Sequence, residues 1–235
     1  MKIFKNLGIE IPENIGKNFL TAIMGGHLNK QIEEMLYEKT NVCIESMSPK
    51  LIFDKYEIEK IVGDKVYFNS GNIFTGPNVS RILKNSETAI IFVQTLGSRI
   101  DELITEESKK GDTLSAIIMD AITTNLLECL GKASSKIIKA EGIKKESWGS
   151  TCSYSPGQFK WTIEEQKEIF SMISPDKIGV KLNASFLMEP FKSSSGVYGF
   201  GPSELISKIK IACEICPKKD CIGRKTADSW QISIT

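Results

Sequence analysis

Apolar and polar residues alternate with two different periods in the first third of the chain. Residues 28–40 carry apolar side chains at helical spacing and predict an amphipathic helix. Residues 51–71 are rich in β-branched and aromatic residues, and a break at Gly63 and Asp64 predicts a hairpin there. The apolar positions of the predicted helix are Leu28, Ile32, Met35 and Leu36.

The next segments change from helix to buried strand and back to helix. Pro77 suits the first turn of a helix, so residues 76–85 predict a short one. Residues 88–97 form a continuous apolar run that ends at a glycine, which is typical of a strand buried on both faces. Ser98 then begins another predicted helix, in which Asp101 completes a capping box.

Residues 112–142 carry the strongest helical pattern of the chain and predict a core helix. Glu128 falls at the edge of the apolar stripe, where a carboxylate is only partly solvated. Two interpretations stay open for Glu128: a functional carboxylate, or a surface residue paired with Lys132 one turn later. The stripe consists of Leu114, Ile117, Ile118, Ala121, Ile122, Leu126, Cys129 and Leu130.

Helix and strand patterns continue in mixed order after a Ser-Pro-Gly turn at residues 155–157. Thr162 and Glu165 predict a capped helix that contains Ile169, Phe170 and Ile173. Residues 178–188 alternate as a strand with one face on the core, and a glycine-interrupted strand that carries Tyr198 follows. The mixed order predicts an α+β fold in one domain over residues 1–235, a twisted, mainly antiparallel sheet with helices around it.

Composition and charge exclude several classes of partner. Of 235 residues, 41% are hydrophobic and 25% charged, as in an ordinary globular protein. Thirty Lys and Arg stand against 29 Asp and Glu, so the basic excess typical of a nucleic-acid-binding protein is missing. No run approaches about 18 apolar residues, and the N-terminus does not read as a secretory signal. We therefore expect a cytoplasmic protein with neither nucleic-acid nor membrane partners.

Common catalytic motifs are missing from the sequence. The single histidine, His27, has no partner motif, so Ser–His or Cys–His catalysis would depend on it alone. There is no GxxxxGK[ST] phosphate loop, and the glycines of "GVYGFG" do not open a helix after a strand. We therefore name no catalytic residue.

Three cysteines cluster near the C-terminus, within a Cys-containing segment of about residues 205–235. Cys213, Cys216 and Cys221 have the spacing CxxCxxxxC, and two thiolates at the first spacing can meet one metal ion. Cys152 or an exogenous ligand would complete such a site. Zinc, an iron–sulfur cluster, a redox dithiol and three plain reduced thiols remain open interpretations.

The order of motifs resembles the reactivation domain of cobalamin-dependent methionine synthase, and especially the small stand-alone relatives of that domain. The resemblance covers about residues 87–202, through the helix "SAIIMDAITTNLLECL", the turn "SPG", and the segments "IGVKLNASFLMEP" and "SSGVYGFGP". In that family the domain binds S-adenosylmethionine and faces the cobalamin-carrying domain. Oxidised cobalamin is there reduced by one electron and remethylated.

The resemblance implies a set of S-adenosylmethionine-binding residues. Glu128 matches a family glutamate that contacts the ligand, and Tyr198 matches a binding-site tyrosine. The segment from Ser153 covers the turn that holds the ligand through its backbone, because glycine permits close approach. A plain connecting turn is the alternative. The turn residues are Ser153, Ser155, Pro156 and Gly157.

This chain departs from the family pattern Arg-x-x-x-Gly-Tyr at two positions. Ser153 stands in place of the arginine and Gln158 in place of the tyrosine. A charge-assisted hydrogen bond is worth roughly 1.5–3 kcal/mol, so its loss weakens binding by about tenfold or more. Lys160 lies close enough in sequence to substitute as a point charge.

The resemblance implies an activator of a corrinoid methyltransferase such as methionine synthase. It would bind S-adenosylmethionine for remethylation of cobalamin carried by a partner, with a flavodoxin or ferredoxin as electron donor. Whether the chain is itself an enzyme, the activation subunit, stays open. Two alternatives remain: a non-catalytic corrinoid-protein partner that has lost S-adenosylmethionine binding, and a metal or iron–sulfur redox accessory protein.

Overall fold

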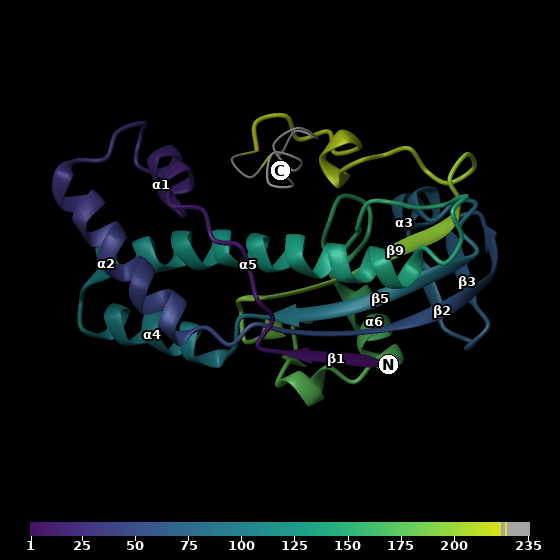
Figure 1. The fold of residues 1–235 in the computed structure, drawn as a ribbon, viewed down its shortest axis with the longest axis horizontal. Helices are drawn as coiled ribbons and strands as arrows, with labels where there is room; N and C mark the ends of the chain where they lie inside the picture. Colours follow the sequence, from purple (N-terminus) through teal and green to yellow (C-terminus); the bar gives the residue numbers. More distant parts are fainter. Residues whose placement is uncertain (222–223, 225–235) are drawn as a thin grey trace.

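A seven-stranded antiparallel sheet forms the centre of the computed structural model, which describes residues 1–221 and 224, apart from the side chains of Phe19 and Ile23 (Figure 1). The strand order is β4-β3-β2-β5-β9-β6, and β1 pairs with the first half of β2. The strands are β1 (Lys2–Lys5), β2 (Lys50–Val62), β3 (Lys65–Phe68), β4 (Ile73–Thr75), β5 (Thr88–Thr95), β6 (Trp148–Ser150) and β9 (Ser193–Pro202).

The central strand β5 confirms the prediction of a strand buried on both faces. Every residue of β5 is buried, between β2 on one side and β9 on the other. Side chains of a strand alternate between its two faces. Ile91 and Val93 accordingly enter one hydrophobic cluster and Ile90 and Phe92 another.

One face of the sheet is covered by the long helix α5 (Thr113–Gly142), close to the predicted bounds. The Asp112 side chain caps it by accepting from the Ser115 N–H at 3.0 Å. The first half of α5 extends beyond the sheet and packs with α1 (Lys17–Ile23), α2 (Lys30–Ser46) and α4 (Ser98–Lys109) in a helical layer (Figure 1). Most of the predicted stripe is buried there, but Ile117 is 42% exposed.

Length and composition alone would allow α5 to cross a membrane. However, 56% of its most apolar window is buried inside the protein, as in a core helix.

The opposite face of the sheet is covered by α3 (Pro77–Ile82), α6 (Gln166–Met172) and two 3₁₀ turns, η1 (Ile163–Glu165) and η2 (Pro175–Ile178). The predicted short helix at Pro77 is confirmed. The predicted hairpin also forms, with Gly63 in the left-handed region (φ 57°) between β2 and β3.

Both predicted capping boxes are wrong. Helix α4 begins at Ser98 itself, after Gly97, and has no side-chain cap; the Asp101 carboxylate instead accepts from the Phe191 N–H. Thr162 precedes η1 without capping it, and Glu165 accepts from the Thr75 N–H at 2.8 Å. In both cases the carboxylate accepts a hydrogen bond from a backbone N–H group that is distant in sequence.

The predicted strand over residues 178–188 is also wrong. Only β7 (Lys181–Leu182) and β8 (Met188–Glu189) pair there, as a small hairpin outside the main sheet. The Asn183 side chain accepts from the N–H groups of Ser185 and Leu187, at 2.9 and 3.1 Å. This side chain folds the segment back on itself, which the alternating apolar pattern did not reveal. The α+β class and the mainly antiparallel sheet are nevertheless confirmed.

Candidate functional site

The first half of β9 carries three consecutive serines whose hydroxyls tie it to its surroundings. Ser193 donates to the Thr95 hydroxyl at 2.8 Å, and Ser195 donates to the Gln166 side chain at 2.7 Å. The Ser194 hydroxyl accepts from Gln94 at 2.8 Å. Among the described residues, no full strand pairs with this half of β9 on its outer side, because β6 pairs only with the far end, at residues 200–202.

The Ser-Pro-Gly turn lies against this part of β9. Tyr154 exchanges two backbone hydrogen bonds with Val197, at 3.0 and 2.9 Å, and the Ser155 hydroxyl donates to the Ser195 carbonyl at 2.6 Å. Gly196 makes this approach possible: a Cβ atom there would lie 2.7 Å from the Tyr154 carbonyl oxygen. The glycines of β9 therefore let the turn pack closely against the strand.

Tyr198 lies where β9, the turn and α5 meet. Its side chain is 4% exposed, and its phenol is acted on by the hydroxyls of Ser135 on α5 and of Ser153 before the turn. Burial raises the pKa of its phenol, and the two hydroxyls partly oppose that shift. Tyr198 and Ser153, both predicted site residues, are thus brought together. Ser135 was missed, because its place on an apolar helix gave no signal in the sequence.

The backbone N–H groups of the turn are used inside the protein, although the family resemblance implied that the turn holds the ligand through its backbone. The Gly157 N–H donates to the Trp161 carbonyl at 2.8 Å, and that of Gln158 to the Ser155 carbonyl at 3.1 Å. The Ser155 N–H donates to the Gln158 side chain at 3.1 Å, and Pro156 has no N–H. The carbonyls of Pro156 and Gly157 are therefore what the turn can offer to a ligand.

Two buried aromatic residues and the hydrogen bonds beside them fix the position of the turn. Tyr154 and Trp161 are buried and stack with ring centroids 5.8 Å apart. The Tyr154 hydroxyl donates to the Phe159 carbonyl, and Asn78 donates to the same carbonyl at 2.9 Å. The turn is thus fixed on a rigid base, while Gly157 at its tip is exposed and left-handed, with φ 88°.

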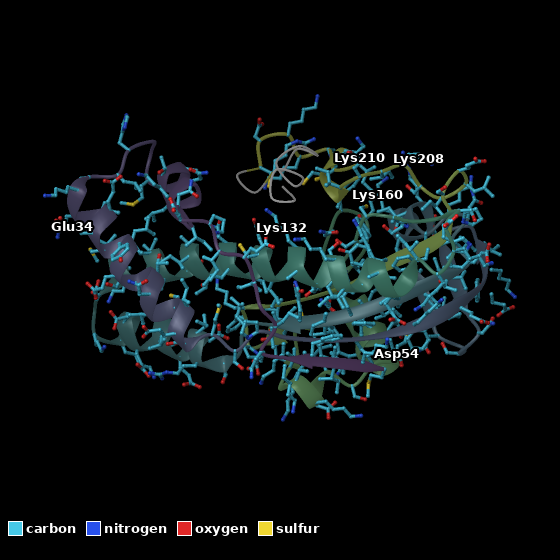
Figure 2. All side chains as sticks on the ribbon, viewed as in Figure 1. Glu34, Asp54, Lys132, Lys160, Lys208 and Lys210 are labelled. Carbon is cyan, nitrogen blue, oxygen red and sulfur yellow. The ribbon has the colours of Figure 1, made fainter. Side chains whose placement is uncertain are left out.

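Glu128 is half-buried on α5, seven residues and two helical turns before Ser135. This spacing places both residues on the same helix face. Between them, Gly131 faces Gln94 of β5, so this face of α5 lies beside the sheet. A cavity of about 430 Å³ lies between residues 7–12 and residues 129–137 of α5. Lys132 lines it, as does Cys129, which follows Glu128 in the sequence. Figure 2 shows Lys132 and Lys160 along the same side of the molecule.

The predicted cysteine cluster gains no support as a metal site. Over the described residues, no three His, Cys, Asp or Glu side chains are grouped closely enough to hold a metal ion, and Cys213, Cys216 and Cys221 are free and half-buried. Residues 222–223 and 225–235 of the Cys-containing segment lie outside the described part. Burial, with the Glu214 carboxylate, raises the pKa of the Cys152 thiol to about 12.

The groups that meet at β9 are suited to binding rather than to proton transfer. Hydroxyls and carbonyls come from α5, β9 and the turn, the Glu128 carboxylate lies two helical turns away along α5, and burial raises the pKa of the Tyr198 phenol above its usual value. Such groups can hold a polar ligand with a positive charge.

Comparison with known proteins shows the fold but does not name a family. No protein-family model and no curated protein matches this chain. Among solved structures, the crystal structure of the MetH reactivation domain bound to AdoHcy matches with a TM-score of 0.62 and 15% sequence identity. The match covers 90% of this chain and 81% of that chain. The predicted resemblance to a reactivation domain is therefore confirmed at the level of the fold.

Proposed function

We propose that this protein binds S-adenosylmethionine along the open half of β9, between α5 and the turn at residues 153–157. One observation carries the proposal: the Tyr198 hydroxyl meets the hydroxyls of Ser135 and Ser153 there. The fold is shared with a reactivation domain whose crystal structure contains AdoHcy, which supports the same class of ligand.

Each part of the site has a group suited to one part of this ligand. The half-buried carboxylate of Glu128 complements the positively charged ammonium group of the ligand's methionine portion. The carbonyls of Pro156 and Gly157 accept hydrogen bonds from amino groups. Lys160, exposed after the turn, supplies a positive charge for the ligand's carboxylate in place of the family arginine.

The bound ligand would serve the methylation of cobalamin carried by a partner methyltransferase protein, with a separate electron donor. Methyl transfer of this kind depends on holding the methyl group in line with its acceptor, and the chain need not supply an acid or a base.

Titration calorimetry with S-adenosylmethionine, under anaerobic conditions, tests the binding. We expect saturable binding by the natural chain and at least about a tenfold loss in Gly157→Val, a difference of about 1.4 kcal/mol. Gly71→Val is the matched control, because Gly71 has the same φ of 88° and lies in a turn between β3 and β4. Equal affinity in both variants would remove the turn from the site.

A second candidate function follows from the internal use of the turn's N–H groups. A turn closed by Gln158, with Ser153 turned toward the Tyr198 phenol, suits a partner of a corrinoid protein that no longer binds S-adenosylmethionine. No heat of binding up to millimolar ligand, together with co-elution with a corrinoid methyltransferase, would favour this function.

A further inference from the structure

The C-terminal CxxC pair lies in a tight turn that is anchored to the core. Cys213 is in the 3₁₀ turn η3 (Ala212–Glu214), and the Cys216 N–H donates to the Cys213 carbonyl at 3.4 Å. Ala212 and Ile215 pack against the hydrophobic cluster on the α6 face of the sheet. The turn is thus held in place from both sides of Cys213.

The geometry of this turn suits a disulfide. Two residues joined by a backbone hydrogen bond across a four-residue turn have Cα atoms less than about 7 Å apart. Disulfides span Cα separations of about 4.4–6.8 Å. Side chains three residues apart in a 3₁₀ turn lie on the same side. The backbone turn from Cys213 to Cys216 therefore places the two residues within the range that a disulfide spans.

Charged side chains of both signs lie around the pair, with Glu214 between the two cysteines and Asp220 further along the same loop. The guanidinium of Arg224 donates to the carbonyls of Cys216 and Lys218, at 3.3 and 2.9 Å, and so is fixed beside the pair. Lys218 and Lys219 are exposed on the same loop.

We propose that Cys213 and Cys216 form a reversible thiol–disulfide pair. A thiolate of the pair attacks a small-molecule disulfide and releases one thiol, and the second cysteine then displaces the other. One S–S bond forms in the protein, one is broken in the oxidant, and two small thiols are the reduced products. Among the interpretations that the sequence left open, the structure favours this dithiol over a metal site.

The pair also lies beside the candidate binding site. Cys216 acts electrostatically on Tyr154, and Glu214 on Cys152, so the turn faces the chain on both sides of Ser153. Oxidation would consequently change the segment that lies against the site.

Incubation of the anaerobically purified protein with oxidised glutathione tests this pair. We expect titratable thiols, counted after unfolding, to fall from six per chain by two, with a loss of about 2 Da. A peptide that joins Cys213 to Cys216 should appear on digestion and vanish with dithiothreitol. Cys221→Ser is the matched control and should still form this bond, whereas Cys213→Ser should not.

Three results would overturn the proposal. The first is a natural chain that keeps all its thiols at excess oxidised glutathione, and the second is a bond to Cys152 or Cys221 instead. The third is near-stoichiometric zinc or iron that disappears in Cys213→Ser, which would assign these cysteines to a metal.

Discussion

Replacing Gly196 with alanine would test whether β9 holds the turn at its edge. The added Cβ atom would lie 2.7 Å from the Tyr154 carbonyl oxygen and 3.0 Å from the Ser155 hydroxyl. Non-bonded atoms prefer separations of about 3.5–4.0 Å, so the turn must move away from β9. The clash is with backbone, which cannot rotate out of the way as a side chain can.

The cost can be worked out from the contacts that would break. Overpacking of this kind costs about 1–3 kcal/mol, and each of the two backbone hydrogen bonds between Tyr154 and Val197 contributes about 1 kcal/mol. We expect a loss of about 3 kcal/mol in the free energy of unfolding. For a chain of this length, that lowers the melting temperature by about 6–12 °C.

Thermal unfolding followed by circular dichroism gives the melting temperature, and calorimetric titration gives the affinity for S-adenosylmethionine. Gly131→Ala is the control, because its Cβ would approach only the Gln94 side chain, at 3.4 Å. Alanine also favours a helix over glycine by about 1 kcal/mol, so this variant should be as stable as the natural chain or more so. A melting temperature in Gly196→Ala within about 2 °C of the natural value, with unchanged affinity, would refute the packing argument.

Three further predictions concern buried thiols, a helix cap and Tyr198. Burial raises the pKa of Cys43 and of Cys152 to about 12, so both thiols stay protonated in the folded chain at a pH where they ionise in the unfolded chain. Above pH 9 the free energy of unfolding should therefore fall by up to about 1.4 kcal/mol per pH unit for each thiol. In urea titrations at alkaline pH, Cys43→Ala should show a shallower fall than the natural chain. Asp112→Ala removes the side chain that caps α5, so the free energy of unfolding should fall by about 1 kcal/mol. Ser98→Ala removes no cap and should have the melting temperature of the natural chain. Equal losses in the two variants would contradict the assigned caps. Tyr198→Phe keeps the packing but leaves two hydroxyls without their partner, so we expect a loss of about 1–3 kcal/mol and weaker ligand binding, and unchanged values would contradict its role.

Strong, long patterns allowed most of the architecture to be predicted. The α5 stripe exceeds the length over which helix and strand patterns are confused, and the shorter run of β5 is rich in β-branched residues and ends near Gly97. Pro77 and Gly63 mark local structure by their own backbone limits. The cap at Ser98 was not predictable, because Asp101 bonds to the N–H of Phe191, which is distant in sequence. At residues 178–188 the local bonds of Asn183 to the N–H groups of Ser185 and Leu187 override the alternating pattern.

The candidate site was predictable only in part, for the same reason. The turn and Tyr198 stood out through glycine, proline and the family resemblance. Ser135 approaches them only because α5 packs across β9, and no local pattern encodes that contact. The internal use of the turn's N–H groups depends on Trp161 and Gln158, which close the turn in three dimensions.

A crystal structure of the protein grown with S-adenosylhomocysteine tests the central claim most directly. We predict ligand density along the open half of β9, with Glu128, Tyr198 and the carbonyls of Pro156 and Gly157 within hydrogen-bonding distance or one water away. Density elsewhere, such as in the cavity beside residues 7–12, or an empty β9 edge at saturating ligand, would contradict the proposed binding site.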